Sequence, residues 1–137
     1  MDANPSAHPM IARHFTTILY VTGVITMLGI VQFVLPAVAL RLSNLHVDEG
    51  AGLVFAKHWG LMAFCFGALL VYAARHPESR RPIVIATAVE KLGMVSLIAF
   101  GWNDPLLAGL HPVLFADGAS VVLYAIYLCS ASSEGNH

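Results

Sequence analysis

Four long apolar runs, separated by short polar stretches, dominate the pattern of this sequence. They cover residues 15–40, 53–74, 82–102 and 106–130. Each run holds at least roughly the 20 residues that an α-helix needs to cross the hydrocarbon core of a bilayer. Because backbone polar groups in hydrocarbon must be hydrogen-bonded within the protein, such runs form helices. The pattern therefore predicts an all-α fold, a bundle of four transmembrane helices over residues 15–130.

Polar segments flank the predicted bundle. Residues 1–14 contain two prolines and are expected to form a flexible N-terminal tail, and residues 131–137 a polar C-terminal tail. The first apolar run is too long for the core of a cleaved signal peptide, so we interpret it as a retained span. The connection at residues 75–81 holds three arginines, and that at 102–105 holds none. Because cytoplasmic loops are rich in Lys and Arg, both termini are predicted on the cytoplasmic side.

The composition supports the membrane class. Hydrophobic residues make up 58% of the 137 positions and charged residues 11%, against about 45–50% and 25% in soluble domains. The formal net charge of -1 gives no basic field for nucleic acid, so no nucleic-acid partner is expected. Cys65 and Cys129 fall at different depths of their spans, which predicts buried thiols without a disulfide. Their spacing fits no zinc motif.

Small residues on the second run indicate close helix packing. Ala56, Gly60, Ala63 and Gly67 recur at steps of three and four, so they share one helix face. Such a stripe lets the backbone of a partner helix approach closely.

Two other runs carry polar residues on a helix face. On the first run, Thr22, Thr26 and Gln32 are expected to form helix–helix hydrogen bonds, and Pro36 to kink the helix. On the third run, Glu90 shares a small-residue face with Gly93, which predicts that this face meets another helix. Lys91 is turned away from that face by about 100°.

Six ionisable residues lie within or at the edge of the spans and form the candidate polar cluster: Lys57, His58, Glu90, Lys91, His111 and Asp117. A single charge at the bilayer centre costs roughly 2.5–3.5 kcal/mol on insertion scales, so pairing is expected. Depth along antiparallel spans allows Lys57 to pair with Asp117 or Glu90, or Lys91 to pair with Asp117. These charges fit either a functional site or a fixed ion pair that sets helix register.

Three chemistries fit this cluster. His58 and His111, at similar depth, are suited to ligate a haem iron, or else are packing histidines. With Glu90 and Asp117 they could instead bind a divalent metal, although no HExxH spacing is present. A proton relay or a small-molecule pocket needs only paired ionisable groups in a partly dry cavity. The sequence assigns no catalytic residue, metal site or cofactor, because no catalytic triad order or phosphate-binding loop is evident.

The layout of the chain also carries a family resemblance. It is carried by five features: Leu35-Pro36, Trp59-Gly60-Leu61, Gly67, the basic turn from Arg75 to Pro82, and Glu90-Lys91. In this layout the chain resembles the DoxX-like group of small bacterial four-helix membrane proteins. Members of that group are mostly of unknown activity, and some are accessory subunits in redox or quinone-linked systems. The resemblance implies no catalytic residue.

Three functional hypotheses follow. The first is a protein of the bacterial cytoplasmic membrane, embedded in the lipid bilayer, that either is a partner-binding subunit or binds a small apolar ligand. Its partner would be another membrane protein or a second copy of the chain. The second is a membrane redox enzyme or subunit that binds haem, metal or quinone near the histidines and carboxylates. The third is proton-coupled transport, for which four short spans leave little room in one copy.

Overall fold

The computed structural model describes residues 8–134, and this part of the chain is helical without strands. The elements in chain order are α1 (His8–Met27), α2 (Ile30–Val34), α3 (Pro36–Leu42), α4 (Ala51–Arg75), η1 (Pro77–Ser79), α5 (Arg80–Phe100), η2 (Pro105–Leu110) and α6 (His111–Glu134). Helix α1 already begins at His8 and α6 continues to Glu134, so both helices extend into the segments predicted as tails. Residues 1–7 and 135–137 lie outside the described residues.

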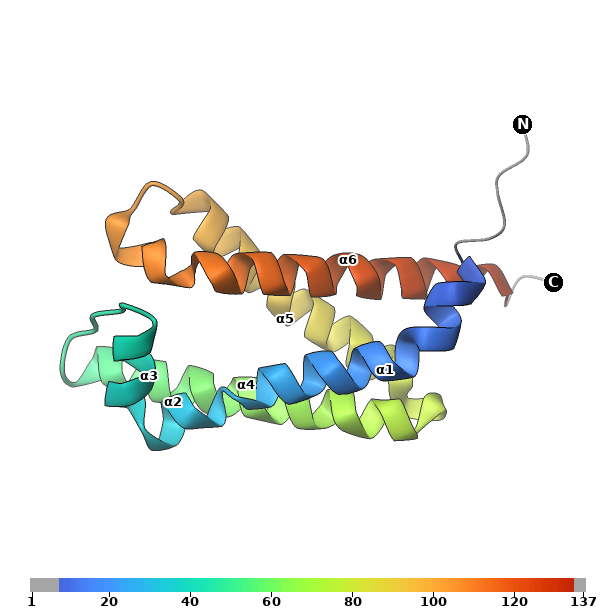
Figure 1. Cartoon of the computed structure of the whole chain (residues 1–137), viewed down its shortest axis with the longest axis horizontal. Coiled ribbons are helices and arrows are strands. Elements are labelled where there is room, and N and C mark those ends of the chain that lie inside the picture. Colours follow the sequence, from blue (N-terminus) through green and yellow to red (C-terminus); the bar gives the residue numbers. More distant parts are fainter. Residues whose placement is uncertain (1–7, 135–137) are drawn as a thin grey trace.

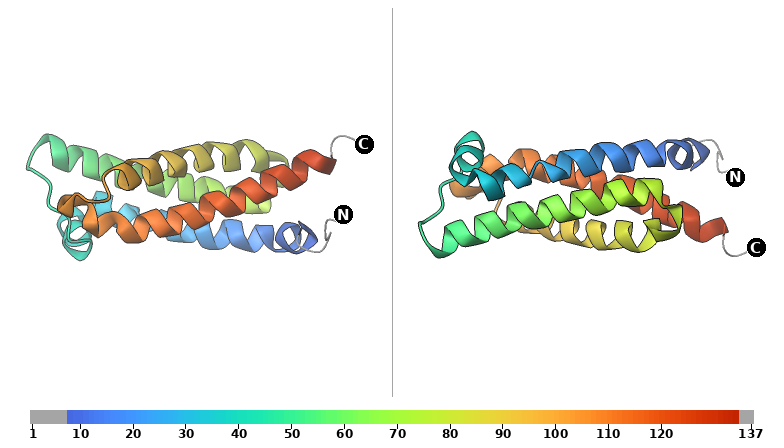
Figure 2. Two further views of the ribbon diagram at one scale, coloured as in Figure 1. Left: turned by 90° about the horizontal axis from the view of Figure 1, so that it is seen from above. Right: turned by 90° about the horizontal axis from the view of Figure 1, so that it is seen from below.

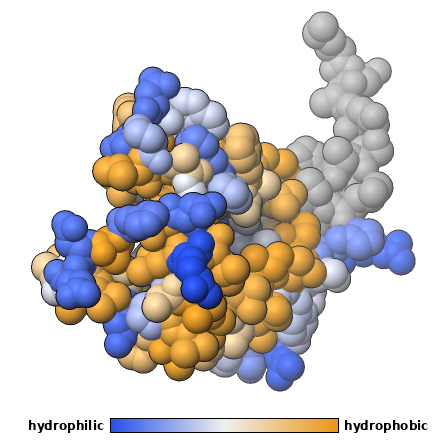
Figure 3. All heavy atoms as spheres, turned by 60° about the vertical axis from the view of Figure 1, so that its left-hand side comes forward, coloured by the Kyte–Doolittle hydropathy of each residue, from blue (hydrophilic) through white to orange (hydrophobic). Residues whose placement is uncertain are grey.

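Four helices are long and apolar enough to cross a membrane, and they indicate an integral membrane protein. The segments are Arg13–Val34, Ala51–Arg75, Pro77–Phe100 and Pro105–Ala131. Much of the bundle surface is apolar, and hydrophilic residues gather at the end turned toward the viewer in Figure 3. The four predicted spans are therefore present. The first is shorter than residues 15–40, because α3 is a separate short helix.

The first apolar run is broken twice. Leu28 and Gly29 donate backbone hydrogen bonds three residues back, to Ile25 and Thr26, which ends the regular α-helical pattern of α1. Pro36 then begins α3 after Leu35, whose φ of -125° and ψ of 61° are not helical. The predicted kink at Pro36 is confirmed as a complete break, since proline cannot donate the hydrogen bond that would continue α2.

The bundle consists of two antiparallel helix pairs. α1 and α2 pack mainly along α4, and α5 packs mainly along α6. Figures 1 and 2 show α1 beside α4, and the start of α1 and the end of α6 at one end of the molecule. We call this the arginine end, because four of the five described arginines, Arg13, Arg75, Arg80 and Arg81, belong to segments there, while Arg41 lies on α3. The opposite end, formed by residues 43–50 and 101–110, is the loop end.

The hydrophobic core lies toward the arginine end and joins the two pairs. Phe15 and Leu19 of α1, Leu70 of α4 and Tyr124 of α6 are all 0% exposed. The ring of Phe15 stacks on Tyr127 at 3.6 Å between centroids and meets Tyr124 edge-on at 6.3 Å. These aromatic contacts tie α1 to α6, so the two pairs are closely packed in this half of the bundle.

The predicted small-residue stripe on α4 packs inside the protein. A Cβ atom added to Gly60 would lie 2.6 Å from the carbonyl oxygen of Gly29 and 2.9 Å from the backbone nitrogen of Phe33. One added to Gly67 would lie 2.5 Å from the carbonyl oxygen of Gly23. The absence of side chains at these positions lets α4 contact the backbone of the first span directly. The predicted hydrogen bond of Gln32 is also formed, from its Nε2 to the carbonyl oxygen of Ala56 at 2.7 Å.

This packing predicts opposite outcomes for two glycine substitutions. Gly60→Ala should lower the free energy of unfolding by about 1–3 kcal/mol, because the new methyl group overlaps the α2 backbone. Gly93→Ala is the matched control: its Cβ would meet nothing within 4 Å, so it should be neutral or stabilise by up to about 1 kcal/mol through helix propensity. Unfolding in mixed SDS micelles measures both, and equal effects would contradict the predicted interface.

Candidate functional site

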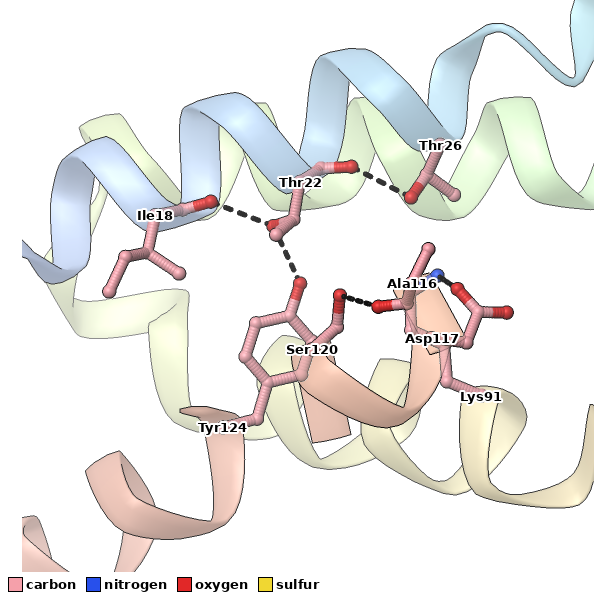
Figure 4. Close-up of polar contacts among 8 residues, drawn as sticks. All are labelled: Ile18, Thr22, Thr26, Lys91, Ala116, Asp117, Ser120 and Tyr124. Carbon is pink, nitrogen blue, oxygen red and sulfur yellow. Dashed lines mark hydrogen bonds and ion pairs between the residues drawn. The ribbon is translucent and has the colours of Figure 1, made fainter. Parts of the chain in front are cut away.

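The candidate site is built around an ion pair between the two helices of the second pair. Nζ of Lys91 on α5 donates to Oδ1 of Asp117 on α6, as Figure 4 shows. The Lys91 side chain is 5% exposed and the Asp117 side chain 16%. Three ion pairs were compatible with the depths of the charged residues in their spans, and the structure forms the one between Lys91 and Asp117. Burial of both charges is tolerated because each offsets the other, and loss of either partner would leave an uncompensated charge.

The orientation of α5 differs from the prediction. Its buried residues are Val84, Thr87, Lys91 and Ile98, which follow one another at helical spacing. Gly93, on the small face with Glu90, is exposed and contacts no neighbouring helix. The prediction that this small face meets another helix was therefore wrong. Lys91 takes the buried position because it reaches a carboxylate on α6.

A hydroxyl chain next to the ion pair connects α6 with α1. The hydroxyl of Tyr124 donates to Oγ1 of Thr22 at 2.7 Å, and Thr22 donates in turn to the carbonyl oxygen of Ile18 at 2.8 Å. Figure 4 shows the Tyr124 ring reaching across from α6 to α1. Sequence reasoning missed this tyrosine. Its position seven residues after Asp117, two turns along the same face, was the available signal.

A cavity of about 180 Å³, partly open to the bundle surface, lies beside the ion pair between all four spans. Its walls come from α1, α2, α4, α5 and α6 and are mostly apolar or small, including Gly60 and Ala63. The polar and aromatic residues on its wall are Thr26, Gln32, Trp59, Glu90, Lys91 and Asp117. The structure thus brings three of the six predicted cluster residues, Glu90, Lys91 and Asp117, to one cavity.

Glu90 is the carboxylate of this cavity without a direct partner. It is half-buried and forms no hydrogen bond or ion pair within the described part of the chain. The charges of Lys91 and Asp117 nevertheless lie close enough to act on it. Because Lys91 is already paired with Asp117, Glu90 leaves the cavity wall with one more acidic than basic group.

Two further hollows adjoin the cavity. One of about 240 Å³ shares Thr26, Lys91 and Asp117 with it and extends to Ser120. Another of about 340 Å³ shares Gln32 and Trp59 with it and continues to the loop end. Their common lining residues place the three hollows in a row along the bundle, where the two helix pairs contact each other less than within each pair.

The remaining cluster residues lie elsewhere. Lys57 is half-buried, with its ammonium 5.6 Å from the ring centre of Phe33. His58 is exposed on α4, and His111 stacks on Trp102 at 4.0 Å between ring centroids. Neither histidine lines the cavity. The described residues contain no group of three or more His, Cys, Asp or Glu side chains placed to hold a metal ion.

The cysteines also differ from the prediction. Cys65 and Cys129 form no disulfide, but both are exposed on the bundle surface rather than buried. Exposure of an apolar thiol is compatible with a helix face that lies against lipid.

Comparison with known proteins adds no relative: no family model, curated protein or solved structure matches the chain. The resemblance to the DoxX-like group therefore stays a prediction from sequence layout.

The ion pair predicts strong coupling between two substitutions. Lys91→Met or Asp117→Leu alone should lower the free energy of unfolding by about 3–5 kcal/mol, because each leaves an unpaired buried charge. The double variant should lose much less than the sum, which a double-mutant cycle measures. Lys57→Met, at the one other lysine of the chain, is the control and should cost under about 1 kcal/mol. Additive effects of the two single variants would contradict the pair.

Proposed function

We propose that this protein binds a small, mainly apolar molecule inside the membrane, in the cavity between its four spans. The single observation that carries the proposal is the cavity itself, with mostly small and apolar walls and a few polar groups contributed by several helices. Ligand sites typically combine an apolar lining with a small number of polar groups that fix orientation. An apolar cavity of ~150 Å³ is already large enough to hold benzene, so the cavity of about 180 Å³ accommodates a single-ring molecule.

The packing favours a ligand over a partner helix. The stripe with Gly60 and Gly67, which a partner-binding subunit would direct outward, is already used against the first span. The charges are also not fully paired, since Glu90 has no direct partner. An acceptor left in a cavity is available to a bound molecule, whereas fixed structural pairing would leave none.

The other two hypotheses gain less support. A haem or metal between His58 and His111 would need both imidazoles at one site, but one is exposed and the other is stacked on Trp102. A quinone remains a chemically reasonable occupant of an apolar cavity. For proton-coupled transport, the ion pair, Glu90 and the Tyr124 hydroxyl would supply the exchangeable protons, although no observation indicates a second state of the bundle.

We also propose an orientation and a location. The arginine end carries four of the five arginines, Arg13, Arg75, Arg80 and Arg81, whereas the loop end has one, Arg41 in the last turn of α3. By the bias of basic residues toward the cytoplasm, the arginine end and both termini are placed there. The bacterial cytoplasmic membrane is the proposed location, in keeping with the DoxX-like layout.

Filling the cavity tests the proposed function. Ala116 is exposed and lines the cavity, so Ala116→Leu should fill part of it without blocking a helix contact. Benzyl alcohol is the probe, and Trp59 on the cavity wall is the fluorescent reporter in a Trp102→Phe background, since the chain has two tryptophans. Ala116→Leu should weaken probe binding about tenfold or more, because the leucine occupies the same volume.

The matched control is Ala125→Leu, an exposed alanine of the same helix that lines none of the described cavities. It should leave probe binding unchanged. If both leucine variants bind benzyl alcohol equally, or if neither benzyl alcohol nor benzylamine, an amine of the same size, alters Trp59 fluorescence, the cavity is not a ligand site and the proposal is wrong.

A further inference from the structure

We infer that the molecule bound in the cavity is a small lipophilic cation, a protonated amine with an apolar body. This inference rests on the proposed function and adds the charge of the ligand to it. It follows from the charges and hydrogen-bonding groups on the cavity wall, from one aromatic ring, and from the charge of the loop end.

The charge on the cavity wall favours a cation. Glu90 and Asp117 contribute two carboxylates and Lys91 one ammonium. The ion pair between Lys91 and Asp117 leaves Glu90 as the uncompensated group. In a site of low dielectric constant, a ligand of opposite charge offsets the cost of an unpaired carboxylate, whereas an anionic ligand would add to it.

The free hydrogen-bonding groups are mainly acceptors. Gln32 donates its Nε2 to the carbonyl oxygen of Ala56, which leaves its Oε1 as an acceptor on the wall. Thr26 donates its hydroxyl to the carbonyl oxygen of Thr22 at 2.7 Å. Lys91 uses one of its three N–H donors on Asp117, so the remaining donors are its other two, the second N–H of Gln32 and the indole N–H of Trp59. The two carboxylates, the Gln32 carbonyl and the Thr26 hydroxyl offer more acceptor sites than these donors fill. A ligand with several N–H donors can satisfy the acceptors on this wall. An ammonium group suits it, because it carries N–H donors and no acceptor.

Trp59 supplies an aromatic face for the same group. It lines both the cavity and the hollow toward the loop end. Indole is the most favourable aromatic partner for a cation, and the attraction increases when water is excluded. A carboxylate and an indole that line the same cavity are therefore suited to an ammonium group, while the apolar walls contact its hydrocarbon body.

The loop end provides a matching approach. Its two connections contain three carboxylates, Asp48, Glu49 and Asp104, against one arginine beside them, Arg41 in the last turn of α3. The hollow of about 340 Å³ runs from residues of both connections, including His46 and Leu106, to Trp59 and Gln32. The excess of carboxylates over basic groups at the loop end raises the local concentration of cations there and repels anions. The loop end, where the row of hollows begins, thus favours cations as the cavity does.

The test compares two probes of the same size that differ in charge. Benzylamine, protonated at neutral pH, and benzyl alcohol, which is neutral, are titrated against the Trp102→Phe variant in nanodiscs of zwitterionic lipid. The Trp59 fluorescence reports both titrations. We expect benzylamine to bind about 10- to 100-fold more tightly, the range of a charge-assisted hydrogen bond within a cavity.

Glu90→Gln assigns the preference to its side chain. This variant keeps the shape of the residue and removes its charge, so benzylamine should lose its advantage while the affinity for benzyl alcohol stays within about twofold. Glu78→Gln, in the exposed η1 turn at the arginine end, is the matched control and should bind both probes as the parent does. The probe comparison in the parent does not depend on the folding of Glu90→Gln.

The outcomes separate the two proposals. Equal binding of the two probes, or tighter binding of benzyl alcohol, overturns the cation inference and leaves the proposed function standing. A preference for benzylamine that persists in Glu90→Gln also overturns the inference, because a group other than Glu90 would then be responsible for it. If neither probe binds, both the inference and the proposed function are wrong.

Discussion

The ion pair between Lys91 and Asp117 is the interaction on which the arrangement of the bundle depends. Each of these charges would cost several kcal/mol if it lay alone in hydrocarbon, and their pairing offsets that cost. Their pairing fixes the rotation of α5 against α6 and brings Lys91 to the buried face. That rotation in turn places Glu90 on the cavity wall beside the pair. The site is thus a consequence of how two charges are neutralised between two helices.

Two kinds of packing divide the molecule and account for the cavity. The first pair is held by direct backbone contact through Gly60 and Gly67, where no side chain separates the helices. The two pairs meet through larger groups, the aromatic rings around Phe15 and the hydrogen bond from Tyr124 to Thr22. Helices held apart by side chains leave space wherever those side chains are small. The row of hollows follows this junction from the ion pair to the loop end.

The sequence predicted the four spans, the small-residue stripe and the Lys91–Asp117 pair as one of three alternatives. These features depend on local composition, on helical spacing and on depth, all of which can be calculated from residue numbers. It did not predict which face of α5 is buried, because lipid and protein interior are both apolar and the usual contrast between faces is missing. For the same reason the exposed His58 and the buried Tyr124 could not be distinguished. Only the contacts between helices decide such positions, and these depend on the whole bundle.

The most direct test of the ion pair is solid-state NMR in lipid bilayers, with ¹⁵N at the lysine side chains and ¹³C at the aspartate carboxyl carbons. The chain contains two lysines, Lys57 and Lys91, so two ammonium signals are expected and a Lys57→Arg sample assigns them. The account predicts a strong dipolar coupling between Nζ of Lys91 and Cγ of Asp117, with slow hydrogen exchange at Nζ. An Nζ of Lys91 that shows no coupling and exchanges rapidly with water would contradict it.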